Sequence, residues 1–199
     1  MRMTRSAPEW YLEDIRKGYY GKSPKFPSRK TIFHESVKKR YISTLTFKNG
    51  NSLLMTPKPL GFGRDSTIQD YMSNLKDKNV KTIIVLLESH EERGLIKNYE
   101  DNGFEVIHFP IKDFNVPKDM GDLSRVLHVI RNRLARHSVA MHCFGGNGRT
   151  GLVAASMLVQ MGLESEKAIR TIRKYRPEAI ETKDQEQFIY EYENYLSLR

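Results

Sequence analysis

The chain has 199 residues, of which 39% are apolar, and it carries one cysteine and a formal net charge of +9. This length suffices for one substantial hydrophobic core, so a single domain is the default expectation. One cysteine excludes an intramolecular disulfide and a zinc site built from several thiolates, so the thiol is either a packing residue or a reactive group.

The sequence also gives no sign of membrane insertion or export. It contains no stretch of about 18 uncharged apolar residues, and its start, MRMTRSAPEW, lacks the apolar core of a secretory signal. We therefore expect no transmembrane segment and a cytoplasmic location.

Most of the positive charge lies in residues 1–41. They contain eleven Lys or Arg against four Asp or Glu, a net of +7, and aromatic residues are interspersed among them. This composition suits contact with an anionic partner, and a solvated extension explains it equally well. We expect residues 1–40 to form a basic N-terminal extension and residues 41–199 to form the folded domain.

The rest of the chain alternates between strand and helix patterns. The segments 41–47 and 52–56 are predicted to pair as a hairpin, because the Asn-Gly-Asn turn between them supplies residues that adopt a positive φ. A capping box at Ser66 (STIQ) predicts a helix as far as about Lys78. The further predicted elements are strands at 82–87, 105–109 and 138–142 and helices at 91–103, 120–137, 150–162, 165–175 and from Thr182, whose capping box includes Gln185. Such alternation predicts an α/β fold with helices on both faces of a central sheet.

A glycine-rich motif, HCFGGNGRTG (142–151), lies between a predicted strand and a predicted helix. A glycine-rich turn before a helix directs several backbone N–H groups and the positive end of the helix dipole to one point, which favours a bound phosphate. Gly145, Gly146 and Gly148 allow the chain to turn tightly there.

Cys143 lies at the start of this loop and is the expected nucleophile. The N–H groups and the helix dipole that favour phosphate also favour a thiolate over a thiol. Arg149 offers a planar guanidinium that can hold two phosphate oxygens, and Thr150 can donate a hydrogen bond to the departing thiolate.

Three segments together resemble a known family. HCFGGNGRTG resembles the H-C-x5-R-[S/T]-G signature of the cysteine-based protein tyrosine phosphatase superfamily. PIKDFNVP (110–117) is similar to the acid loop of small dual-specificity phosphatases, and RPEAIETKDQEQF (176–188) resembles the R-P-G-A-I-E-T-x-x-Q stretch of their atypical members. The resemblance covers about residues 53 to 197. It implies a phosphatase-type central sheet in a single domain.

The chain departs from the larger tyrosine-specific enzymes of this superfamily at two places. It has no Trp-Pro-Asp acid loop, and Glu181 stands where those enzymes carry a water-positioning Gln. The compact, atypical dual-specificity class is therefore the closer resemblance.

The resemblance implies a two-step phosphomonoester hydrolase. Cys143 attacks phosphorus while Asp113 protonates the leaving oxygen, and water then cleaves the phosphocysteine with Asp113 as the base. His142 is expected to orient the loop through hydrogen bonds, and Asp119 is the alternative acid. The residues expected to bind phosphate are Phe144, Gly145, Gly146, Asn147, Gly148 and Arg149.

No metal or other cofactor is expected, because the backbone N–H groups and Arg149 supply the charge stabilisation. The favoured substrate is a phosphorylated protein, with phosphotyrosine ahead of phosphoserine and phosphothreonine. Phosphoinositides and an RNA 5′-polyphosphate end are the alternatives, although the variable loop positions Phe144 and Asn147 carry no lysine for a highly anionic headgroup. A phosphate-binding pseudophosphatase is the alternative without catalysis, and Arg64 is a candidate second anion contact.

Overall fold

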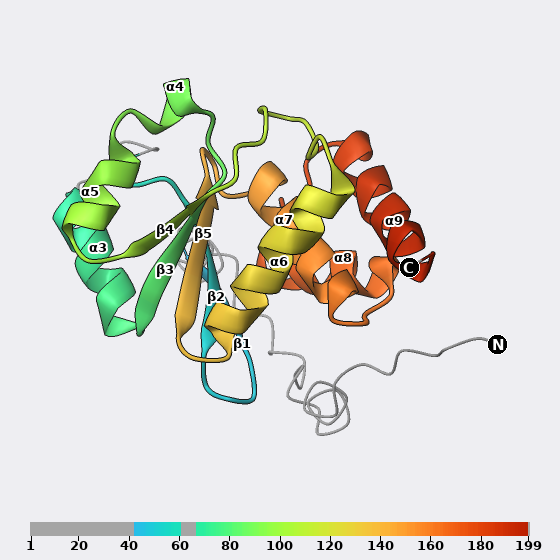
Figure 1. The fold of residues 1–199 in the computed structure, drawn as a ribbon, viewed down its shortest axis with the longest axis horizontal. Coiled ribbons are helices and arrows are strands. Elements are labelled where there is room, and N and C mark those ends of the chain that lie inside the picture. Colours follow the sequence, from blue (N-terminus) through green and yellow to red (C-terminus); the bar gives the residue numbers. More distant parts are fainter. Residues whose placement is uncertain (1–41, 61–66, 199) are drawn as a thin grey trace, which may run out of the picture.

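A computed structural model describes residues 42–60 and 67–198 (Figure 1). The predicted basic extension and Arg64 lie outside these ranges, so the expected contact of the extension with an anionic partner stays a prediction. The boundary at residue 40 therefore stays a prediction.

The described residues contain one five-stranded sheet, in the order β1-β2-β5-β3-β4. Only β1 is antiparallel to its neighbour, and it forms the predicted hairpin with β2; the other pairings are parallel. The strands are β1 (Ser43–Thr46), β2 (Ser52–Pro57), β3 (Val80–Val85), β4 (Glu105–His108) and β5 (Ser138–Cys143). Because β5 is central, its carboxyl end is flanked by strands on both sides, which is where open α/β sheets bind ligands.

Helices cover both faces of this sheet, as expected for the α/β class (Figure 1). The helices are α3 (Ile68–Asp77), α4 (Ser89–Glu92), α5 (Leu95–Asp101), α6 (Met120–Leu134), α7 (Gly148–Gln160), α8 (Ser165–Tyr175) and α9 (Lys183–Ser197). Helices α3 and α5 pack on one face, and α6 to α9 pack on the other.

The alternation of side chains along β5 connects the two layers. Ala140 belongs to the cluster under α3 and α5, whereas Val139, Met141 and Cys143 belong to the larger cluster under α6 to α9. All of these side chains are buried, because a central parallel strand is covered on both faces. The strand that ends at Cys143 is thus fixed by the core itself.

Two helix predictions need correction. The segment 91–103 is not one helix, because Arg93 (φ +46°) and Gly94 (φ +83°) both adopt the left-handed conformation and separate α4 from α5. The capping box of α3 pairs Thr67 with Asp70, one residue after the predicted cap at Ser66, which lies outside the described residues. The helix is capped at Thr67 because Asp70, three residues later, accepts the Thr67 N–H with its carboxylate.

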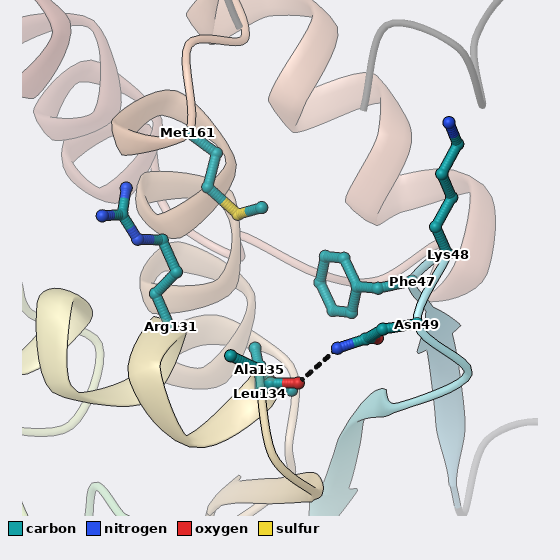
Figure 2. Close-up of a pocket in the computed structure, with 7 residues that line it drawn as sticks. All are labelled: Phe47, Lys48, Asn49, Arg131, Leu134, Ala135 and Met161. Carbon is teal, nitrogen blue, oxygen red and sulfur yellow. Dashed lines mark hydrogen bonds between the residues drawn. The ribbon is translucent and has the colours of Figure 1, made fainter. Parts of the chain in front are cut away.

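The structure also contains a cavity of about 390 Å³ at the end of the sheet away from Cys143 (Figure 2). Its lining residues are Phe47, Lys48, Asn49, Arg131, Leu134, Ala135 and Met161. Met161 follows the last turn of α7, whereas Cys143 precedes the first, so the length of the helix separates the cavity from the cysteine.

Among the described helices, none has the length and the apolar character needed to span a bilayer.

Candidate active site

The candidate site lies where β5 ends and α7 begins. Cys143 is the last residue of β5 and is paired in register with Pro57 of β2, while Asn147 is the N-cap of α7. The N–H groups of the first helical turn have no partners within the helix, so they face the loop together with the positive end of the helix dipole. We call residues 143–149 the phosphate loop.

The cysteine sulfur lies inside this loop. Cys143 is buried, and its Sγ accepts a hydrogen bond from the Gly146 N–H at 3.2 Å. A backbone N–H and a helix N-terminus both favour a negative charge on sulfur. The loop therefore holds Cys143 in the setting of a nucleophile.

Two glycines of the loop lie in close contact with other segments, and at Gly146 the contact is with backbone that cannot move aside. Gly146 has φ +75°, and a Cβ at this residue would lie 2.3 Å from the carbonyl oxygen of Thr56. A Cβ at Gly148 would lie 2.4 Å from Oε2 of Glu181. The phosphate loop therefore passes against the backbone of β2 at one end and against the 176–188 segment at the other.

Arg149 is the centre of a buried ion-pair network. Its side chain is 1% exposed, Nη1 donates to Glu91 Oε2 at 2.7 Å, and Nη2 donates to Glu91 Oε1 at 3.1 Å. Nη1 also donates to the carbonyl oxygen of Ile111 at 3.1 Å, and Nη2 lies 2.9 Å from Asp113 Oδ1. The guanidinium therefore connects α7 with α4 and with the acid loop (residues 110–117).

The surroundings of Arg149 keep both partners charged. Burial alone would lower the pKa of Arg149, but the hydrogen bonds that it donates to Glu91 and the negative charges of Cys143 and Asp113 raise it above its ordinary value. Burial would likewise raise the pKa of Glu91, but the Arg149 guanidinium lowers it overall. The two-hydrogen-bond geometry thus fixes the orientation of the guanidinium.

Two buried polar atoms have no partner in this network. Within residues 42–60 and 67–198, Arg149 Nε and Thr150 Oγ1 find no hydrogen-bond partner, although both atoms are buried. Burying a polar atom without a partner is costly, so such atoms in a loop of this shape indicate a ligand. The free Arg149 Nε and the loop N–H groups match the oxygens of a phosphate.

His142 lies fully buried directly before the cysteine. Its Nδ1 is 3.2 Å from the Cys143 carbonyl oxygen, and its Nε2 is 3.1 Å from the Tyr99 hydroxyl. Since a carbonyl only accepts, Nδ1 carries the proton and Nε2 accepts from Tyr99. Burial lowers the pKa of His142 to about 4, so the ring is neutral at pH 7. These contacts support the predicted loop-orienting role.

Arg176 is a buried residue of the site that the sequence analysis did not identify. Its Nη2 donates to the Gly145 carbonyl oxygen at 2.9 Å, and its Nε donates to Asn147 Oδ1 at 2.6 Å. Nη1 reaches Ser43 Oγ and the Met55 carbonyl oxygen, both at 3.4 Å. Burial lowers the pKa of Arg176, and the charge of Cys143 opposes this shift. Arg176 thus ties the outer side of the phosphate loop to β1 and β2.

The structure distinguishes the two candidate acids. Asp113 is 52% exposed and lies 2.9 Å from Arg149, so it is at the site and reachable by a substrate. Asp119 is the N-cap of α6 and accepts the Asp122 N–H at 2.7 Å. This geometry favours Asp113 as the proton donor.

The structure brings the predicted site residues together, and three residues that the sequence did not indicate make hydrogen bonds to them or to the loop: Glu91, Tyr99 and Arg176. Cys143, Arg149, Thr150, His142 and Asp113 all lie around the phosphate loop. Glu91 and Tyr99 were missed, since neither belongs to a recognisable motif. Arg176 lies in the quoted 176–188 stretch, and an arginine next to a proline in that stretch was the available signal. Among the described ranges, no group of three or more His, Cys, Asp or Glu residues is arranged to hold a metal ion.

The fold and the site define a class of protein. A central parallel strand ends in a cysteine, and an arginine follows six positions later in the first turn of a helix. This arrangement is typical of the cysteine-based protein tyrosine phosphatase superfamily. The chain belongs to this superfamily as an atypical dual-specificity-like member. More particularly, the chain belongs to the family described as "Polymorphic toxin system, DSP-PTPase phosphatase", whose model matches residues 60–163.

Curated relatives agree with this assignment. The PRL-1 phosphatase of Drosophila melanogaster is 29% identical over 137 residues, which cover 67% of this chain and 73% of that protein. Cyclin-dependent kinase inhibitor 3 of Rattus norvegicus is 27% identical over 139 residues, which cover 65% of each protein. The chain is thus a protein tyrosine or dual-specificity phosphatase.

Solved structures show the same fold. A kinase-associated phosphatase, with its catalytic-site cysteine replaced by serine, has a TM-score of 0.71 and 25% identity, covering 80% of this chain and 97% of that chain. A mutant form of Tk-PTP has a TM-score of 0.66 and 28% identity, covering 79% and 98%. The predicted fold class is confirmed.

Proposed function

We propose that Cys143, Arg149 and Asp113 carry out the phosphatase reaction through a phosphocysteine. The Cys143 thiolate attacks phosphorus, so that the S–P bond forms as the P–O ester bond breaks, and Asp113 gives its proton to the leaving oxygen. In the second step Asp113 accepts a proton from water, the water oxygen bonds to phosphorus, and the S–P bond breaks. Inorganic phosphate leaves and the thiolate is restored.

The phosphate loop stabilises the charge of both steps. The N–H groups of residues 144–149 and the helix dipole bind the oxygens of the transferring group, and Arg149 adds its Nε and Nη2. Thr150 Oγ1, which has no other partner in the part of the chain that the structure describes, donates to the thiolate as it departs. Arg149 Nη2 exchanges its contact with Asp113 for one with phosphate, which releases the carboxyl group for proton transfer.

One observation carries this proposal: a buried Cys143 accepts a backbone hydrogen bond beneath a helix N-terminus, beside an arginine whose buried Nε has no partner. The solved relative in which the catalytic-site cysteine is replaced by serine supports the same role for the cysteine of this loop.

The experiment is hydrolysis of p-nitrophenyl phosphate by the wild-type enzyme and by Cys143→Ser. We expect the variant to lose at least about 1000-fold in kcat, because a serine hydroxyl is a much weaker nucleophile than a thiolate. A ³²P-labelled phosphoenzyme, trapped by rapid acid quench, should form in the wild type only. Retained activity in Cys143→Ser would contradict the covalent mechanism.

We propose a phosphotyrosine-containing protein as the substrate. Phe144 is 41% exposed in the phosphate loop, and Phe114, directly after Asp113, is 62% exposed. Exposed aromatic rings beside a phosphate site favour an aromatic phosphoester, because ring contacts add to the binding free energy. Turnover of matched phosphotyrosyl and phosphoseryl peptides, a phosphoinositide and 5′-triphosphorylated RNA tests this choice. A preference for the lipid or the RNA would overturn it.

A further inference from the structure

A lysine side chain is held at the rim of the phosphate loop. Lys58 directly follows Pro57, which pairs with Cys143, and the Lys58 N–H donates to the Phe144 carbonyl oxygen at 3.1 Å. Its Nζ lies 4.1 Å from the centroid of the Phe144 ring, a cation–π contact. The ammonium group thus lies against Phe144, the residue directly after Cys143.

An arginine lies near the same rim. Arg93 follows Glu91 by two residues, and Glu91 is anchored to Arg149 through both carboxylate oxygens. Arg93 is exposed in a left-handed backbone conformation, and within the described residues its side chain makes no hydrogen bond or ion pair. Its position is therefore set by the backbone while its guanidinium remains available.

Both cations follow residues that are anchored at the phosphate loop: Lys58 follows Pro57, which pairs with Cys143, and Arg93 lies two residues after Glu91, which binds Arg149. The pKa of Lys58 is lowered first by burial and then by the positive charge of Arg93; the carboxylate of Glu91 opposes this shift, and the charge of Arg149 adds to it. Two carboxylates at the site, Glu91 and Asp113, already bind Arg149, Glu91 through two hydrogen bonds and Asp113 at 2.9 Å. Like charges placed together without a free carboxylate are unfavourable, and a bound anion removes that cost.

We propose that Lys58 and Arg93 form a second anion-binding position beside the phosphate loop, which binds a glutamate or aspartate side chain adjacent to the phosphotyrosine of a protein substrate. This inference rests on the proposed function and deepens it, because it specifies the sequence around the phosphorylated residue. Phe144 contacts Lys58 and is itself part of the phosphate loop. The groups that would bind an aromatic phosphoester and a neighbouring carboxylate are therefore adjacent.

The experiment compares matched phosphotyrosyl peptides. One peptide carries two glutamates on each side of the phosphotyrosine, and its partner carries glutamines at the same positions. For the wild type at about 50 mM salt, we expect kcat/KM to be about three- to tenfold higher for the acidic peptide, the size expected for two exposed charge pairs. At about 1 M salt, where the Debye length is about 3 Å, this preference should shrink.

Variants test the residues separately. Lys58→Met keeps the chain packed on Phe144 but removes its charge, and Arg93→Ala removes the guanidinium; each should move the acidic-to-neutral ratio toward one. Lys58→Arg, which retains the charge, should keep the ratio. Arg136→Ala is the matched control, because it removes one positive charge two residues before β5, at the end of the strand away from Cys143. Its ratio should equal that of the wild type. The ratio is informative because general damage to the phosphate loop lowers both rates alike.

The outcomes separate the two proposals. If the wild type hydrolyses both peptides at equal rates, or if the ratio persists in Lys58→Met and Arg93→Ala, the second anion position is contradicted. If these variants lose activity on a multiply phosphorylated inositol lipid and not on the acidic peptide, the peptide assignment is wrong. If the wild type hydrolyses no aryl phosphate at all, the proposed function itself fails.

Discussion

The phosphate loop and the acid loop meet at Arg149 but are held in different ways. The phosphate loop is packed against β2 at Gly146 and tied down by buried Arg176. In the acid loop residues 112–115 are exposed, and its two contacts with the guanidinium come from the carbonyl oxygen of buried Ile111 and from half-exposed Asp113. The residues proposed to bind phosphate are therefore held by the core, whereas the proposed proton donor lies on an exposed segment.

This difference predicts that the two functions can be damaged separately. A change in the phosphate loop should affect binding, chemistry and stability together, because the loop is continuous with the buried sheet. A change in the acid loop should affect proton transfer while the fold is unaltered.

The largest effect is expected from Gly146→Ala. Its Cβ would lie 2.3 Å from the Thr56 carbonyl oxygen, and the residue would also be strained at φ +75°. We expect a loss of about 3 kcal/mol in the free energy of unfolding and of about 100-fold in kcat/KM, because the backbone of β2 cannot move aside. Urea unfolding and p-nitrophenyl phosphate hydrolysis measure both.

Gly50→Ala provides the control for backbone strain. Gly50 has φ +81°, yet no atom lies within 4 Å of its added Cβ. We expect it to cost about 1 kcal/mol and to leave the activity unchanged. Equal behaviour of the two variants would show that close packing against β2 does not hold the phosphate loop.

The second prediction concerns the pH dependence of stability. Burial lowers the pKa of His142 to about 4 from 6.5, so the folded state binds this proton less readily than the unfolded state. The free energy of unfolding is therefore highest above pH 6.5, and it falls by about 3 kcal/mol as the pH decreases toward 4. Urea unfolding between pH 4.5 and 7 should show most of this slope in the wild type and a smaller slope in His142→Gln.

Other groups can be separated from His142. Hydrogen bonds from Arg133 lower the pKa of Glu105 to about 2, so its contribution is lost mainly below pH 4.5, outside the chosen range. Burial also lowers the pKa of His137, and His137→Gln measures its share within the range. An unchanged slope in His142→Gln would exclude His142 as the source.

The third prediction is Asp113→Ala. Loss of the proton donor should lower kcat by about 100-fold for phosphotyrosine, whose phenolic oxygen leaves poorly without a proton, and much less for p-nitrophenyl phosphate. Stability should change little, because the side chain is 52% exposed. Equal losses on the two substrates would mean that Asp113 acts through Arg149 and not through proton transfer.

The same division explains what the sequence could predict. The phosphate loop and the Thr182–Gln185 capping box depend on residues that are close in the sequence, so their pattern alone indicates their structure. Glu91 is 58 positions from Arg149, and it lies in a segment whose periodicity indicated a single helix. The break at Arg93 and Gly94 separates α4, which carries Glu91, from α5, and helix periodicity does not reveal such a break.

Arg176 shows a different limit of the sequence. The 176–188 stretch was recognised as a unit, but Arg176 acts by reaching Gly145 and the β1–β2 hairpin, which is more than 100 residues away in the chain. An arginine is rarely buried unless its hydrogen bonds are satisfied, and those partners become visible only once the sheet is assembled.

The smallest effect is expected from Asp119→Ala, which tests whether the acid loop ends before α6. Asp119 lies six residues after Asp113 and accepts the Asp122 N–H at 2.7 Å as the N-cap of α6. Its loss should cost about 1 kcal/mol in the free energy of unfolding, as for other N-caps, and kcat for phosphotyrosine should stay near the wild-type value. Asp119→Asn retains a capping oxygen and should recover most of the stability. A large loss of kcat in Asp119→Ala together with a normal rate in Asp113→Ala would assign the proton donor to Asp119, and the contact between Asp113 and Arg149 would then be structural.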